Sequence, residues 1–353
     1  MFVAWRDLRF ARGRFALMAA VVVLITLLVG LLSGLTAGLG HDSTSAVSEL
    51  PADHLVFSAP ADGAAPSFTS SSFGAGAWQR WAAVPSVERA EPLGVATTRV
   101  ESGSRSAALT TMGVRPGSAL APEAVALGNV VLSTGAAAEL GAGRGDTVTL
   151  AGAALTVTAV AGDAAFSHTP VIWADLGDWQ RLASGGAAAT VIALTTDGRV
   201  DLAAADGSLG TRTLSRADSL PAIGSYSAEN GSLQLMRGFL FAISALVIGA
   251  FFTVWTIQRS GDIAVLKALG ASSGYLLRDA LGQAVVLLVG GTALGTGLAA
   301  ALGAVVSGSV PFLLAPDTVL VPAVVIIVLG ALGAALSIRR ITAVDPLTAL
   351  SAR

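Results

Sequence analysis

Four long stretches of the chain lack Asp, Glu, Lys, Arg and His and consist mainly of Leu, Val, Ile, Ala and Phe. They cover residues 15–40, 238–258, 280–316 and 318–338. A helix needs about 20 predominantly apolar residues to cross the hydrocarbon core of a bilayer. The pattern therefore predicts four membrane-spanning helices, which we place at residues 15–39, 236–258, 276–306 and 318–338.

Two of these stretches need interpretation because of their length. The third, as one helix, would be roughly 55 Å long at 1.5 Å per residue, which is too long for one crossing. Pro311 and Pro316 indicate instead that a short outer loop, 307–317, follows the third span. The first stretch exceeds the apolar core of about 7–15 residues found in signal peptides, so we interpret it as a retained anchor.

Residues 40–235, between the first and second spans, change to a pattern typical of a folded domain. Apolar and Thr residues alternate in 146–150 and 155–160, which predicts a hairpin. Segments 95–100 and 107–114 predict a second strand pair. Short helices are expected at 73–84, 135–140 and 176–183, and a mobile loop at 60–72. The predicted fold is an α-helical membrane protein with four transmembrane helices (1+3) plus an α+β extracytoplasmic domain between helices 1 and 2.

The charge distribution predicts which side of the membrane each segment occupies. Segments 1–14, 258–279 and 339–353 carry ten basic and four acidic residues, whereas 40–237 carries 11 Arg and 18 acidic residues. Because basic residues stay on the cytoplasmic side, both termini are expected there, with the large domain outside. We therefore expect a multi-pass protein of the cell membrane, with residues 1–14 as an amphipathic helix on its inner surface and 339–353 as a cytoplasmic tail.

Several kinds of chemistry are excluded by missing residues. The chain has no cysteine, so it has neither disulfides nor thiol chemistry. A Walker A loop requires Gly-Lys-Ser/Thr, but the sole lysine, Lys267, follows Leu266. The three histidines lack metal-ligand spacing. We expect no ATPase site, no catalytic centre, no bound metal, no permanent cofactor and no nucleic-acid partner.

Residues 259–275, on the cytoplasmic side between the second and third spans, predict a short amphipathic helix. Apolar residues recur at helical spacing, with an acid early, a base late and a glycine as its stop. One interpretation is a connector lying on the membrane surface, and the other is a coupling element displaced by a cytoplasmic partner. The candidate coupling residues are Arg259, Asp262, Ile263, Leu266, Lys267, Leu269 and Gly270.

This segment, Gln258-Arg-Ser-Gly-Asp-Ile-Ala-Val-Leu-Lys-Ala-Leu-Gly-Ala-Ser272, resembles the signature of FtsX-like permeases of ABC exporters, the MacB type. The closing residues 339–350, with Asp345-Pro-Leu-Thr-Ala-Leu350, and the start of the predicted hairpin at Gly145-Asp-Thr-Val148 resemble the same family. The resemblance implies a homodimeric permease that pairs with two copies of a separate ABC ATPase, where ATP and Mg²⁺ bind. It also implies mechanotransmission, in which closure of the ATPases pushes on residues 259–271.

Gly30, Gly34 and Gly38 follow one another at four-residue spacing in the first span. Small residues at this spacing let another helix approach closely. They are candidate helix-packing residues, either at a seam between two copies of the chain or simply as frequent residues of an Ala/Gly-rich membrane helix.

The segment before the second span, 224–236, is the expected substrate site and more weakly resembles the haem-exporting members of the family. Haem requires an apolar slot and a donor such as Tyr, His, Met or a carboxylate near the iron. The alternative is interfacial anchoring, with Glu229 as an N-terminal helix charge. The candidate substrate residues are Tyr226, Glu229, Met236, His41 and His54, whereas His168 is expected to be structural.

Export of haem from the outer leaflet is therefore the leading functional hypothesis, with membrane lipid around the substrate. Two alternatives stay open. In the first alternative, the chain exports peptides, antibiotics or lipids. In the second, it signals to an extracellular cell-wall hydrolase without carrying a substrate.

Overall fold

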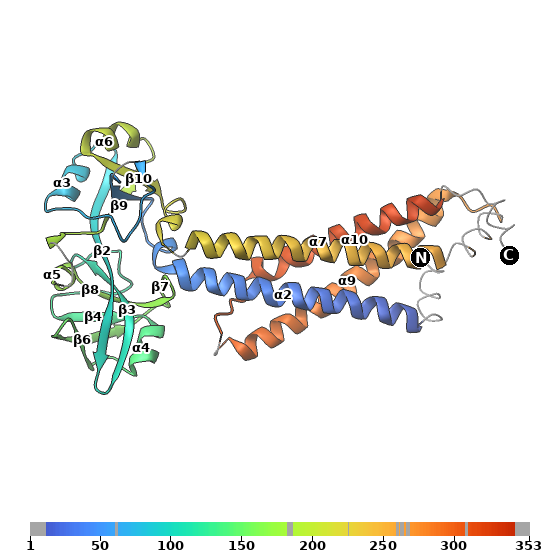
Figure 1. Cartoon of the computed structure of the whole chain (residues 1–353), viewed down its shortest axis with the longest axis horizontal. Coiled ribbons are helices and arrows are strands. Elements are labelled where there is room, and N and C mark those ends of the chain that lie inside the picture. The colour runs from blue at the N-terminus through green and yellow to red at the C-terminus, as the bar shows by residue number, and fades with distance from the viewer. Residues whose placement is uncertain are drawn as a thin grey trace. The chain divides into compact units, whose positions relative to one another are not determined.

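The computed structural model divides into two compact units. Residues 39–231 form an outer unit, and the segments before and after it form a helical unit. Figure 1 labels the elements of both. The structure describes residues 12–60, 63–181, 186–224, 226–258, 261, 265, 269–307 and 310–342.

Four helices in the described residues are long and apolar enough to cross a membrane. They are α2 (Arg12–Ser48), α7 (Tyr226–Gln258), α9 (Ser273–Val306) and α10 (Pro316–Thr342). This confirms the predicted fold class. The helices α2 and α7 continue well beyond the expected spans 15–39 and 236–258, because residues 40–48 and 226–235 are helical as well.

The helical unit has its own buried core, to which all four helices contribute. Val29 of α2, Phe252 of α7, Leu288 of α9 and Ile326 of α10 are each almost fully buried in one cluster. In addition, the hydroxyls of Thr253 and Ser337 lie 2.8 Å apart and join α7 to α10. Many large apolar side chains remain exposed outside this core, including Leu24, Leu246 and Leu332, as expected of helices surrounded by lipid.

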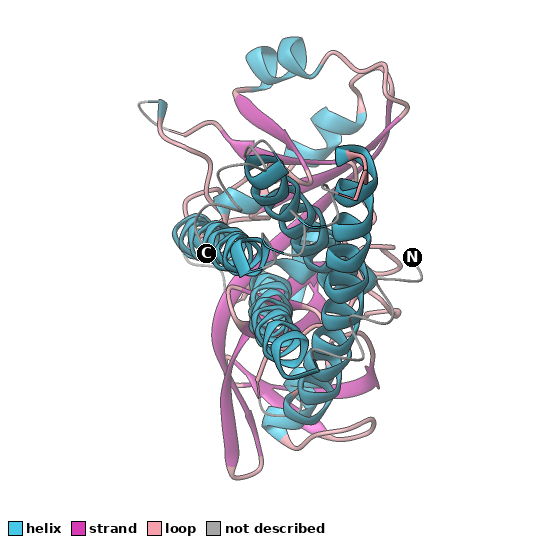
Figure 2. Ribbon diagram, turned by 90° about the vertical axis from the view of Figure 1, so that its right-hand side faces the viewer, coloured by secondary structure: helices cyan, strands magenta, loops and turns pink. Residues whose placement is uncertain are grey.

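One part of the outer unit is an antiparallel sheet, in the order β10 (Thr211–Ser215), β1 (His54–Ser58), β9 (Val191–Thr196) and β2 (Val87–Ser102). Figure 2 shows strands in magenta and helices in cyan. The helices α3 (Ala77–Ala82) and α6 (Leu202–Leu209) share a buried cluster with this sheet.

The other part closes into a barrel, because β2 is long enough to pair on both sides. Its second half, from Gly94 onward, pairs with β3, and Val100 and Glu101 also pair with β5. The ring runs β2–β3–β8–β4–β6–β5 and back to β2. Its further strands are β3 (Arg105–Val114), β4 (Asn129–Leu132), β5 (Thr147–Leu150), β6 (Ala153–Val160) and β8 (Thr169–Asp175).

Both predicted strand pairs are confirmed, since β5 pairs with β6 and β2 with β3, each antiparallel. The three predicted helices correspond to α3, α4 (Thr134–Leu140) and α5 (Leu176–Gln180). The segment 60–72 differs from the expected mobile loop. Within its described part, Phe68 is almost fully buried against Phe57 and Phe166, with ring centroids 5.1 and 5.3 Å away, so aromatic packing anchors the segment.

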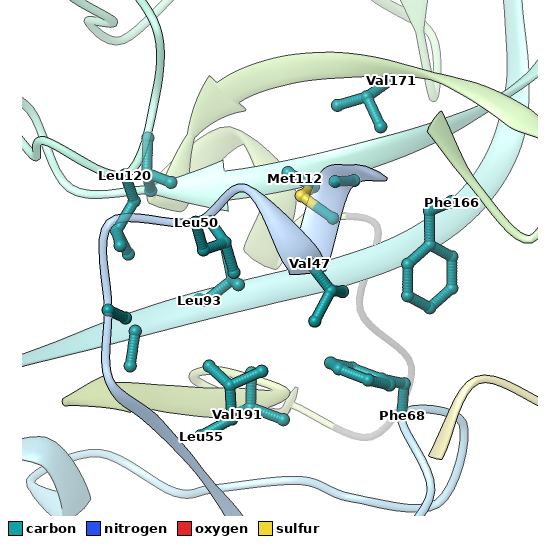
Figure 3. Packing of buried hydrophobic residues seen from close by; sticks show 14 of the residues in the cluster. Val47, Leu50, Leu55, Phe68, Leu93, Met112, Leu120, Phe166, Val171 and Val191 are labelled. Atoms are coloured by element: carbon teal, nitrogen blue, oxygen red, sulfur yellow. The ribbon is translucent and has the colours of Figure 1, made fainter. Parts of the chain in front are cut away.

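The end of α2 is buried in the largest hydrophobic core of the outer unit. Figure 3 shows Val47 and Leu50 among side chains from several strands, including Leu55, Leu93 and Met112. The last turn of α2 therefore is part of the hydrophobic core of the outer unit and not merely a connection to it.

Candidate functional site

The outer end of α2 is held by a two-residue hairpin turn between β7 (Ala165–Phe166) and β8. The hydroxyl of Ser45 accepts a hydrogen bond from the backbone N–H of Ala165 at 2.8 Å. The backbone N–H groups of Ser167 and His168 donate to the carbonyls of Ser43 and Asp42 at 2.9 and 3.1 Å. These bonds fix the turn against the last two turns of α2.

The same turn reaches the first turn of α7 through a side chain. Ser167 and His168 both have positive φ angles, 50° and 61°, as a tight hairpin turn of this kind requires. Non-glycine residues adopt this conformation at some cost in strain, and such strain persists where the surroundings enforce it. The Nε2 atom of His168 lies 2.6 Å from a carboxylate oxygen of Glu229. The turn thus contacts α2 by its backbone and α7 by its imidazole.

A second histidine, His41 of α2, lies between two carboxylates. The Nε2 atom of His41 is 3.2 Å from Asp163, and its Nδ1 atom is 3.7 Å from Glu49. Asp42, next to it in the outer unit, is partly buried, and this burial raises the pKa of its carboxyl, an effect that nearby His41 and His168 oppose. Together these groups form a polar row, defined here as His41, Asp42, Glu49, Asp163, His168 and Glu229.

The structure brings only some of the expected substrate residues together. Glu229 and His41 belong to the polar row, and Tyr226, three residues before Glu229, packs against the core of the outer unit. His54 instead begins β1 within the sheet, opposite Ser215 and Leu194. Met236 lies in the helical unit with 48% of its surface exposed.

No group of three or more His, Asp or Glu side chains in the described part of the chain has the geometry of a metal site. In the polar row each histidine instead lies within 4 Å of at least one carboxylate. His168 and Asp163 were not among the expected substrate residues. The one feature of the sequence that could have pointed to His168 was the short Ser-His turn between two apolar strand segments.

The three candidate helix-packing glycines of α2, Gly30, Gly34 and Gly38, lie against other segments of the same chain. A Cβ on Gly30 would lie 2.8 Å from the Cβ of Ala299 in α9. On Gly34 it would collide with the ring of Phe312, and on Gly38 with the backbone carbonyl of Pro311. The backbone N–H of Leu313 also donates to the carbonyl of Gly34 at 3.1 Å. Within this chain these glycines are therefore helix-packing residues, because the face they form contacts α9 and the loop before α10.

Most of the expected coupling residues lie outside the described part of the chain, namely Arg259, Asp262, Ile263, Leu266 and Lys267. Residues 1–11 of the amphipathic helix expected at 1–14 lie outside it as well, and residues 12–14 belong to α2. Leu269 is 80% exposed. Gly270 has a φ of 93°, the left-handed conformation that often ends a helix. Ser272 then caps α9 by accepting a hydrogen bond from the N–H of Tyr275.

The fold defines a polytopic membrane protein with a mixed outer domain inserted after its first helix. The family model described as MacB-like periplasmic core domain matches residues 15–211, and the model described as FtsX-like permease C-terminal matches residues 235–346. The chain belongs to this family of MacB-type, FtsX-like permeases, which confirms the resemblance noted in the sequence.

Two relatives and one solved structure give further likenesses. A protein of Staphylococcus haemolyticus named "Putative hemin transport system permease protein HrtB" is 38% identical over 128 residues, 36% of each chain, so the aligned part spans little more than a third of that relative. The "Uncharacterized ABC transporter permease Mb2592" of Mycobacterium bovis is 25% identical over 369 residues, 98% of each chain. The periplasmic region of MacB from Actinobacillus actinomycetemcomitans is 12% identical with a TM-score of 0.37, covering 47% of this chain and 90% of that one.

Proposed function

We propose that this chain is the permease subunit of an ATP-driven ABC efflux pump that exports haem or a similar amphipathic compound from the membrane. In this proposal both termini are cytoplasmic and the outer unit is extracytoplasmic. Two copies of the chain act with two copies of a separate ATPase, which binds ATP and Mg²⁺. The chain itself then hydrolyses nothing and moves its outer unit in response to the ATPase cycle.

The observation that carries the proposal is the continuity of α2. This helix has 37 residues, about 55 Å at 1.5 Å per residue, whereas about 20 residues suffice to cross the membrane. Its last turns are bonded to the 165–168 turn and contribute Val47 to the outer core. A displacement of the helix at its cytoplasmic end is therefore expected to move the outer unit directly, since no flexible loop intervenes.

Two side chains in the first turn of α7 support an amphipathic cargo. Tyr226 and Glu229 are three residues apart, so they share one helix face. Glu229 is partly exposed next to His168, and Tyr226 borders apolar core residues. A macrocycle with an apolar plane and a central iron suits such a border between apolar and oxygen-bearing side chains. The hemin transport name of the staphylococcal relative favours haem as the cargo.

Haemin titration of the purified full chain tests this site. We expect a saturable shift of the Soret band with the wild type, and a loss of at least tenfold in affinity in the double variant Tyr226→Phe, Glu229→Ala. Ser227→Ala changes an exposed residue of the same turn and is expected to bind haemin like the wild type. If the wild type shows no saturable shift, haem is discarded as the cargo, and peptides, antibiotics or lipids take its place.

A further inference from the structure

The outer unit contains a pocket of about 270 Å³ that shares Glu49 and Asp163 with the polar row but is lined by none of the candidate substrate residues. It lies beside the end of α2, between the loop around residues 119–122, the loop 161–164 and strand β8. Specific small-molecule pockets typically measure about 300–1,000 Å³. This pocket therefore fits a small organic group rather than a large ring system.

The walls and the rim of the pocket differ in chemistry. Apolar residues line it, among them Leu50, Leu120, Pro122 and Trp173. Glu49 and Asp163, by contrast, line it with carboxylates whose side chains are 60% and 66% exposed. The nearby basic group is His41, which lies between these two acids. A ligand with an apolar body and a positive charge complements this arrangement.

Trp173, one of the residues that line the pocket, provides a second observation. Trp173 is only 3% exposed, yet its indole N–H has no hydrogen-bond partner in the described part of the chain. A buried N–H without an acceptor costs free energy, so tryptophan N–H groups usually find a partner. A ligand that offers an acceptor, such as a carbonyl oxygen, removes that cost.

From these three features we propose that the pocket binds a primary ammonium group attached to an apolar side chain and an adjacent carbonyl. This is the chemistry of a peptide's amino terminus with an apolar first residue. The ammonium group pairs with Glu49 and Asp163, the side chain occupies the apolar walls, and the carbonyl accepts from Trp173. The proposal does not depend on haem export, because it concerns a different set of residues.

L-Phenylalaninamide is a suitable probe, because it carries all three groups in a small molecule. Calorimetric titration of the full chain in detergent, without ATPase or haemin, is expected to show saturable binding at one site per chain. N-Acetyl-phenylalaninamide, which lacks the charge, is expected to bind at least tenfold more weakly. Equal binding of both compounds would overturn the proposal, as would the absence of saturable binding of the charged one.

Substitutions locate the binding. We expect Glu49→Gln with Asp163→Asn to weaken binding about tenfold, and Trp173→Phe, which keeps the apolar wall and removes the donor, to weaken it several-fold. The matched control is Glu101→Gln with Glu139→Gln, two exposed acids of the outer unit that do not line the pocket, and it is expected to bind like the wild type. If a pocket variant unfolds, the proposal is tested instead with the wild type. Its indole ¹H–¹⁵N signal of Trp173 is expected to shift on titration with L-phenylalaninamide. An unchanged signal would contradict the proposal.

Discussion

The substitution Gly40→Pro is expected to abolish transport while the partner ATPase still hydrolyses ATP. Residue 40 lies in α2 where the helical unit gives way to the outer unit. Proline there removes one backbone hydrogen bond and clashes with the preceding turn, at a cost of about 3 kcal/mol, and it kinks the helix. If α2 transmits motion as a continuous rod, a kink at this point separates ATP hydrolysis from movement of the outer unit.

The matched control is Gly40→Ala. No atom lies within 4 Å of a Cβ built on Gly40, so alanine is expected to leave transport intact and to stabilise the helix by about 0.5–1 kcal/mol. The measurement is transport and ATP hydrolysis by the reconstituted complex, with assembly checked by size-exclusion chromatography. Should the proline variant fail to assemble, Leu39→Gly, which softens the same turn, is expected to lower the transport per ATP hydrolysed. Undiminished transport in either variant would contradict transmission through α2.

Replacement of Gly34 by alanine is expected to destabilise the helical unit by about 1–3 kcal/mol, the usual cost of overpacking a core. A Cβ there meets the ring of Phe312, which also fills the space above Gly303 of α9. The ring therefore joins the loop before α10 to both α2 and α9. Gly297→Ala is the matched control, because no atom lies within 4 Å of its Cβ, and it is expected to be neutral or slightly stabilising.

A double-mutant cycle separates the clash from other effects of these changes. Phe312→Ala removes the ring, so the pair Gly34→Ala, Phe312→Ala is expected to be less destabilised than the sum of the two single variants. Thermal unfolding in detergent measures all four proteins. If Gly34→Ala unfolds at the same temperature as Gly297→Ala, then Phe312 is not seated against Gly34.

The membrane helices and the strand pairs were predictable from the sequence because each has a local cause. Long uncharged runs determine the spans, and the alternation in β5 and β6 determines the hairpin. The lengths of α2 and α7 were not predictable in the same way. Residues 41–48 are polar enough to suggest a loop, and they remain helical while the outer core buries Ala46, Val47 and Leu50.

The contacts at the candidate site depend on tertiary structure and left little trace in the sequence. His168 and Glu229 are 61 positions apart, and no local pattern indicates that a hairpin turn places them together. Gly34 and Phe312 meet only because two helices and a loop converge. The glycine spacing did predict close packing, but it contained no information on whether the neighbour belongs to the same chain or to another copy.

Export itself is tested most directly with the chain and its ATPase reconstituted together in haem-loaded liposomes. The account predicts that haem leaves the membrane only when ATP is added, at a rate that falls in Gly40→Pro and in the Tyr226→Phe, Glu229→Ala variant. ATP hydrolysis that proceeds normally while haem stays in the membrane would contradict haem export, and would favour another cargo or a signalling role for the outer unit.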